Sequence, residues 1–175
     1  MEIKYVHTFP DVDVEEFEDY LEDPEFNQQL ENLPNVASRS VLENKDLGGG
    51  KRYTKVQYEG KGVPEQAKKI VGEGAVGWIE EVDFNRNIHV HKFRLTPNRM
   101  KDKVKCEGQY LLKPLGPEGG TKREVTMNIK VKMLGVGTIL ERMAKPFLEA
   151  NAKAEERLAR DYIKAHPPKK KGRKK

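Results

Sequence analysis

Among the residues of this chain that could do chemistry are histidines in segments where apolar and polar residues alternate. His89 and His91 stand two positions apart, so on a β-strand their side chains would point to the same face. An unperturbed imidazole has a pKa near 6.5, which suits a general base or, with a third ligand, a metal site. No acidic residue close in the sequence is placed to orient either ring. We therefore expect both histidines, and His7 near the amino terminus, to be structural or surface residues, and we assign no catalytic residue and no metal ligand.

Several other polar side chains could hold the head of a ligand. Tyr110 could hydrogen-bond a polar group, and Arg94 or Arg99 could pair with a carboxylate or a phosphate. Tyr110 could equally be a half-buried strand aromatic, and Arg94 alternates with Phe93, which points it toward water. Cys106 is the only cysteine. Because it lacks a committed histidine partner, we expect it to be an inert, small apolar residue.

Three glycine-rich segments are candidates for a phosphate-binding loop. They cover residues 48–50, 72–77 and 135–137. None follows a strand and opens a helix with the required spacing, apart from a weak match at 135–137 that lacks the lysine and hydroxyl residue of a P-loop. Turns between antiparallel strands account for all three, so the sequence predicts no cofactor.

The overall composition indicates one hydrophilic domain. The chain has 175 residues, 36% of them hydrophobic and 35% charged, with a mean hydropathy of −0.81. This length suits a single core. The lone cysteine excludes an intramolecular disulfide and any multi-cysteine zinc site, and it favours a reducing, cytoplasmic location. No apolar run approaches the roughly 20 residues that a membrane-spanning helix needs.

The end of the chain differs from the rest. Residues 166–175 carry lysine and arginine but no acid, so we expect a disordered basic tail after a folded domain of residues 1–165. The net charge is +5 with this tail and slightly negative without it, so the isoelectric point near 9.1 belongs to the tail. The run from Lys169 to Lys175 could attract an anionic membrane surface or a nucleic acid, although no aromatic residue is interleaved for base stacking.

The elements that must position these residues begin with a strand and two short helices. Strict alternation over residues 2–9 predicts the strand. An aspartate cap then begins a helix that runs to Leu21. A second short helix follows over residues 24–33, entered through an Asp-Pro pair.

Three hairpins and a long helix complete the chain. The expected strands cover residues 36–45, 51–59, 76–84, 88–96, 102–113 and 122–133, with one short helix over residues 64–71. Turns this short require antiparallel pairing, so we expect one seven-stranded antiparallel sheet. The final helix spans residues 135–165, about 40 Å in length, and Pro146 should kink it.

This order of elements creates a packing problem. Seven strands expose a wide face, and one helix about 10 Å across cannot cover it. A twisted sheet that curves around the C-terminal helix solves part of the problem. The fold class is therefore α+β, and the space that remains is either a filled core or a cavity. Methionines among the apolar side chains favour a wall that can adapt to a guest.

Three segments carry a resemblance to a known superfamily. They are HTFPDVDVEEFEDYLEDPEF (7–26), GWIEEVDF (77–84) and VKMLGVGTILERMAKPFLEANAKAEERLARDYI (131–163). They resemble the opening, a middle strand and the closing strand, glycine turn and long helix of START-like, or polyketide cyclase-like (SRPBCC, helix-grip), proteins, and are closest to a little-described bacterial branch. The resemblance covers about residues 1–164. It implies a pocket between sheet and helix for a lipid-like or other apolar molecule. From the side chains that the expected strands and helix supply, we expect its lining to be Trp78, His91, Phe93, Tyr110, Met127, Ile129, Ile139, Met143 and Phe147.

Three functions follow, and fold alone does not choose among them. The first is binding or transport of a hydrophobic small molecule without catalysis. The second is a cyclase or hydrolase, which would need His89 or His91 to converge with Tyr110 or Glu80 inside the cavity. The third is a partner-binding module with a filled core that acts through the basic tail.

Overall fold

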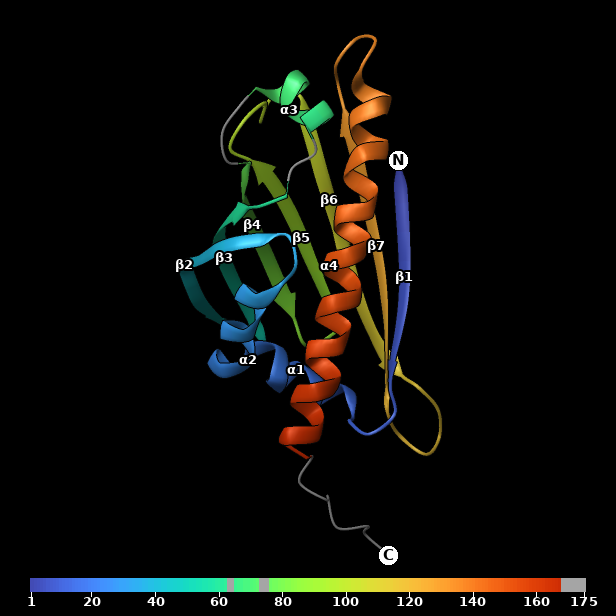
Figure 1. Ribbon diagram of the computed structural model, residues 1–175. Helices are drawn as coiled ribbons and strands as arrows, with labels where there is room; N and C mark the ends of the chain where they lie inside the picture. Colours follow the sequence, from blue (N-terminus) through green and yellow to red (C-terminus); the bar gives the residue numbers. More distant parts are fainter. Residues whose placement is uncertain (63–64, 73–75, 168–175) are drawn as a thin grey trace, which may run out of the picture.

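The computed structural model describes residues 1–62, 65–72 and 76–167. These residues form one sheet, one long helix that lies over it and several short helices at its ends (Figure 1). The elements in chain order are β1 (Glu2–Phe9), α1 (Val14–Glu22), α2 (Pro24–Gln29), a 3-10 turn (Leu30–Asn32), β2 (Val36–Gly48), β3 (Lys51–Gly60), α3 (Glu65–Val71), β4 (Gly77–Asn85), β5 (Val90–Pro97), β6 (Val104–Pro114), β7 (Thr121–Val131) and α4 (Gly137–Ala165).

All strand pairs in the sheet are antiparallel. The strand order is β1-β7-β6-β5-β4-β3-β2, so each strand from β2 to β7 pairs with its neighbour in sequence, and β1 joins at the far edge beside β7. Short turns connect most of these pairs, as the hairpin pattern predicted. The expected α+β helix-grip fold, with two short helices after the first strand, is confirmed.

Two of the boundaries that differ from the sequence prediction lie at turns. β5 begins at Val90, because the backbone N–H of His89 bonds the Arg86 carbonyl oxygen (3.4 Å) and His89 has a positive φ of 52°. The expectation that His89 and His91 share one strand face is therefore wrong. β7 ends at Val131, because Met133 already accepts a hydrogen bond from the first residue of α4.

The start of α4 requires a close backbone approach. A Cβ at Gly137 would collide with the carbonyl oxygen of Val131, so only glycine permits this tight return from β7. The helix then continues for 29 residues with Pro146 inside it. Within the described ranges, no helix is both long and apolar enough to cross a membrane.

The buried apolar cluster with the most residues lies at one end of the molecule. There the last turns of α4 meet α1 and α2 (Figure 1), and the buried cluster consists of Phe9, Val12, Val14, Phe17, Phe26, Leu112, Ala159, Tyr162 and Ile163. A second cluster lies on the sheet around Met127, Ile129 and Val125. The first half of α4 buries Gly137 and Leu140, and the other residues of that half are half-buried or exposed. The second half buries Ala159, Tyr162 and Ile163.

Candidate functional site

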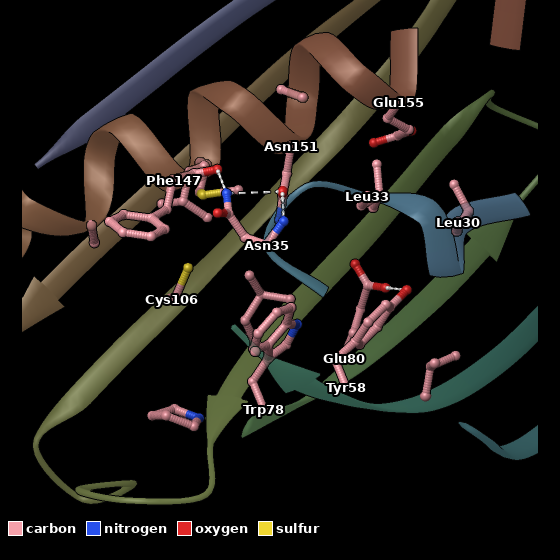
Figure 2. A pocket seen from close by; sticks show the side chains of 18 of the residues that line it. Leu30, Leu33, Asn35, Tyr58, Trp78, Glu80, Cys106, Phe147, Asn151 and Glu155 are labelled. Atoms are coloured by element: carbon pink, nitrogen blue, oxygen red, sulfur yellow. Dashed lines mark hydrogen bonds between the residues drawn. The ribbon is translucent and has the colours of Figure 1, made fainter. Parts of the chain in front are cut away.

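A cavity of about 440 Å³ lies between the sheet and α4. Side chains from β1 and β3 to β7, from the first two-thirds of α4 and from the segment around Leu30 and Leu33 line it (Figure 2). Most of these side chains are apolar. Pockets for small molecules usually measure about 300–1,000 Å³ and have such walls with a few polar groups, so this cavity has the size and character of a binding site.

Aromatic and sulfur-containing side chains form much of the wall. Trp78 on β4 stacks on Tyr58 of β3, with ring centroids 5.2 Å apart and planes 8° from parallel. Met143 and Phe147 line the cavity from α4, and Met127 lines it from β7. The register of β3 and β4 places Tyr58 and Trp78 directly opposite each other, which explains their contact.

The carboxyl groups of Glu80 and Glu155 both line the cavity, and a chain of hydrogen bonds lies behind Glu80. The hydroxyl of Tyr58 donates to Oε2 of Glu80 (3.1 Å) and accepts from Nε of Arg39 (3.2 Å). Nη2 of Arg39 in turn donates to Oδ1 of Asn27 on α2 (3.1 Å). Figure 2 shows Glu80 and Tyr58 side by side on the wall that faces Glu155 of α4.

This environment changes the acidity of Glu80. Burial, reinforced by the negative charge of Glu155, raises the pKa of Glu80 to about 7, although the Tyr58 hydrogen bond and the charge of Arg39 oppose the rise. Burial also raises the pKa of Tyr110, which lines the same cavity, well above its usual range. Glu80 therefore exchanges its proton near neutral pH, while Tyr110 keeps its own.

A second polar group lies where β1 and β7 meet α4. Arg123 is almost fully buried, donates from Nη1 to Oε1 of Glu155 (2.5 Å) and places Nη2 2.9 Å from Nδ1 of His7. Nε2 of His7 lies 3.6 Å from Glu156. Burial and the charge of Arg123 lower the pKa of His7, so His7 is neutral and accepts the arginine hydrogen bond at Nδ1.

Two asparagines tie the rim of the cavity to α4. Nδ2 of Asn35, just before β2, donates to Oδ1 of Asn151 (3.1 Å) and to the carbonyl oxygen of Phe147 (3.1 Å), as Figure 2 shows. These bonds connect the segment after the 3-10 turn to the middle of α4. They hold the helix at a fixed place over the cavity without filling it.

Of the nine residues expected to line a pocket, the structure brings six to the cavity wall. They are Trp78, Tyr110, Met127, Ile129, Met143 and Phe147. Whether they touch a ligand stays a prediction. Cys106 also lines the cavity, and burial raises the pKa of its thiol to about 12, so it stays protonated.

The other three expected residues do not line the cavity. His91 is fully buried under α1, where its Nε2 lies 3.0 Å from Oε1 of Glu18. The ring of Phe93 packs against Gly108, where an added Cβ atom would come within 2.5 Å of it. The same ring stacks on Tyr110. Ile139 is 50% exposed, because the inward stripe of α4 runs through Leu140, Ala144, Phe147 and Asn151 and leaves Ile139 on the outer flank.

Sequence reasoning missed the acid that orients the histidines. Glu18 on α1 is 1% exposed and contacts both Nδ1 of His89 (3.1 Å) and Nε2 of His91 (3.0 Å). More than 70 residues separate it from them, so nothing local indicated the contact. Tyr110 and Glu80 line the cavity but neither His89 nor His91 does, so the convergence of a histidine with Tyr110 or Glu80 that the cyclase or hydrolase hypothesis needs is not formed there. Of the residues described, no group of three or more histidine, cysteine or acidic side chains is arranged to hold a metal ion.

The comparisons with known proteins agree with this architecture. A profile of the family described as "Protein of unknown function (DUF2505)" matches residues 4–163. The chain belongs to this family. No curated protein matches the sequence.

Solved structures with the same fold share little sequence with this DUF2505 chain. The protein TTHA0849 of Thermus thermophilus superposes with a TM-score of 0.66 at 17% identity, over 95% of this chain and 99% of that one. The Zhui aromatase/cyclase of Streptomyces sp. R1128 gives 0.65 at 15% identity, over 95% and 97%. A START superfamily protein of Mycobacterium smegmatis gives 0.59 at 16% identity, over 92% and 98%. The START-like fold that the three sequence segments indicated is confirmed.

Proposed function

We propose that this protein binds a hydrophobic small molecule in the cavity between the sheet and α4. The cavity itself carries the proposal. It measures about 440 Å³, and its wall is apolar except for a few placed polar groups. An empty apolar cavity of this size would cost stability, since its lining gives up dispersion contacts and apolar burial, and a guest restores both.

The structural relatives support the same function at a coarser level. One is described as a START superfamily protein and another as an aromatase/cyclase, so the shared fold accommodates organic molecules in at least one relative. The likeness in sequence is too low to transfer a substrate. For this chain we therefore propose an apolar ligand, whose carbon skeleton must be determined by experiment.

The neutral dye N-phenyl-1-naphthylamine, whose emission rises in apolar surroundings, tests this function. We expect saturable binding at a ratio near one. Met143→Trp should reduce the affinity at least tenfold because it fills the cavity from α4. Ile139→Trp, a matched change on the outer flank of the same helix, should leave the affinity within about twofold. Equal effects of the two substitutions, or no saturable binding, would overturn the proposal.

A cyclase-like reaction is the second candidate, and Glu80 is the observation that favours it. A carboxyl group with a pKa of about 7 inside an apolar cavity can take a proton from a bound substrate at neutral pH. The test uses molecules recovered from the purified protein by gentle extraction. If mass spectrometry shows that the protein converts such a molecule and Glu80→Gln does not, the protein is an enzyme.

The basic run from Lys169 to Lys175 lies outside the described residues. We propose that it strengthens contact with anionic membranes by charge alone, and that the protein works in the cytoplasm. Deleting residues 168–175 should then abolish salt-sensitive co-sedimentation with phosphatidylserine vesicles and leave dye binding unchanged. Unchanged co-sedimentation would remove the tail from the function.

A further inference from the structure

Glu80 is a polar group in the mostly apolar wall of the cavity. Its Oε2 accepts the hydrogen bond from Tyr58, which fixes the orientation of the carboxyl group. Among the described residues none hydrogen-bonds Oε1, and Glu80 keeps accessible surface where it lines the cavity. Figure 2 shows the group pointing into the space below α4. One oxygen is thus held by the protein, and the other is left for a guest.

The neighbouring charges restrict what this guest can present. Glu155 faces Glu80 across the cavity, so a carboxylate head placed beside Glu80 would be the third acidic group there; the cations Lys61 and Arg99 belong to the same cavity lining. An ammonium head would meet two guanidinium groups: that of Arg39, which donates to Tyr58 and Asn27, and that of Arg123, which pairs with Glu155. Both ionic heads would also lose their hydration on entry.

A hydroxyl group avoids these costs. It can donate a hydrogen bond to Glu80 when the carboxyl group is ionised and accept one when it is protonated, so it fits either state. The rest of the guest would lie against Trp78, Met143 and Phe147, which supply apolar and aromatic contact.

We propose that Glu80, oriented by Tyr58, binds the hydroxyl group of an otherwise apolar alcohol or phenol. This inference rests on the proposed function and narrows its ligand class. Arg39 has a positioning role, because it donates to Tyr58 and so holds the Tyr58 hydrogen toward Glu80.

The test compares four ligands that differ only in the head: 1-decanol, decyl methyl ether, decanoic acid and decylamine. Trp78 is the only tryptophan and lines the cavity, so its fluorescence reports binding directly. At pH 8, where Glu80 is mostly ionised, we expect decanol to bind about tenfold more tightly than the ether, which cannot donate. The acid and the amine should also bind more weakly than decanol.

Two matched substitutions locate the effect. Glu80→Leu should bring decanol and the ether within twofold of each other. Glu81→Leu alters the next residue on β4, whose carboxylate accepts from Tyr53, and should keep the tenfold preference. Two results would overturn the inference: equal affinity of the unaltered protein for decanol and the ether, or a preference that survives Glu80→Leu. Tightest binding of the acid or the amine would also overturn it. If none of the four binds, the proposed function fails as well; if all four bind equally, only the hydroxyl recognition fails.

Discussion

The two halves of α4 do different work. The last turns bury Ala159, Tyr162 and Ile163 against α1 and α2, and Tyr162 meets the rings of Tyr20 and Phe26 edge-on. The first two-thirds of α4 lie over the sheet (Figure 1) and line the cavity, with side chains from Leu140 to Glu155. One end of the helix therefore anchors the fold, and the other closes a space that a guest can enter. Stability and binding should respond separately to changes in the two halves.

Truncation of one phenylalanine in each region should give the largest contrast. Phe17 is 1% exposed and stacks on Phe9 at 4.5 Å, so Phe17→Ala should lower the free energy of unfolding by about 3–5 kcal/mol. Phe147→Ala, at the cavity wall, should cost only about 1 kcal/mol because the side chain already faces open space, but it should change ligand affinity. Urea denaturation measures both, and equal losses would contradict the distinction between the buried cluster at the end of α4 and the cavity wall.

The buried acids of the two regions offer the next test. Glu18 of α1 contacts both His89 and His91, and Glu18 and His91 are fully buried. Glu18→Ala should destabilise the protein by about 1–3 kcal/mol, because it leaves a buried imidazole nitrogen without its partner. Chemical denaturation at pH 7 gives the value. A loss below about 0.5 kcal/mol would show that this contact contributes little to the fold.

Glu80→Gln should act in the opposite direction. The pKa of Glu80 is about 7 in the folded protein and about 4.5 when unfolded, so the folded state holds the proton more tightly. Unfolding then releases a proton between these values, and the stability of the unaltered protein relative to Glu80→Gln falls as pH rises from about 4.5 to 7. Above pH 7 the variant should be more stable by about 1–3 kcal/mol. A difference that does not change between pH 4.5 and 8 would exclude a raised pKa.

The smallest effect is expected on the outer flank of α4. Ile139 is half-exposed and lies away from the cavity, so Ile139→Asn should change the free energy of unfolding by no more than about 0.5 kcal/mol. It should also leave ligand affinity unchanged. A loss of stability in thermal unfolding or of affinity in dye binding would mean that the cavity extends to the outer flank of the helix.

Local patterns were sufficient to predict most of the fold. Alternation gave the seven strands, short turns gave antiparallel pairing, and the apolar repeat gave α4. Alternation also placed Trp78 and Glu80 on one face of β4, where both line the cavity. The errors came from features without a local signal. The positive φ of His89 takes it out of the strand, and the helical position of Ile139 could be assigned only once the inward stripe was known.

Contacts distant in sequence could not be predicted at all. Glu18 joins His91 across 73 residues, and Arg123 joins His7 across 116. Arg39 reaches the cavity only because β2 pairs with β3 and brings it to Tyr58. These polar contacts depend on how the sheet packs against α1 and α4, which local patterns in one sequence do not reveal.

A crystal structure of the protein soaked with 10-bromo-1-decanol tests the central claim most directly, since bromine can be located by its anomalous scattering. The account predicts a bromine peak inside the cavity among Trp78, Met127 and Phe147, with the hydroxyl group within hydrogen-bond distance of Glu80. A cavity closed by side chains, or bromine bound only on the outer surface, would contradict it.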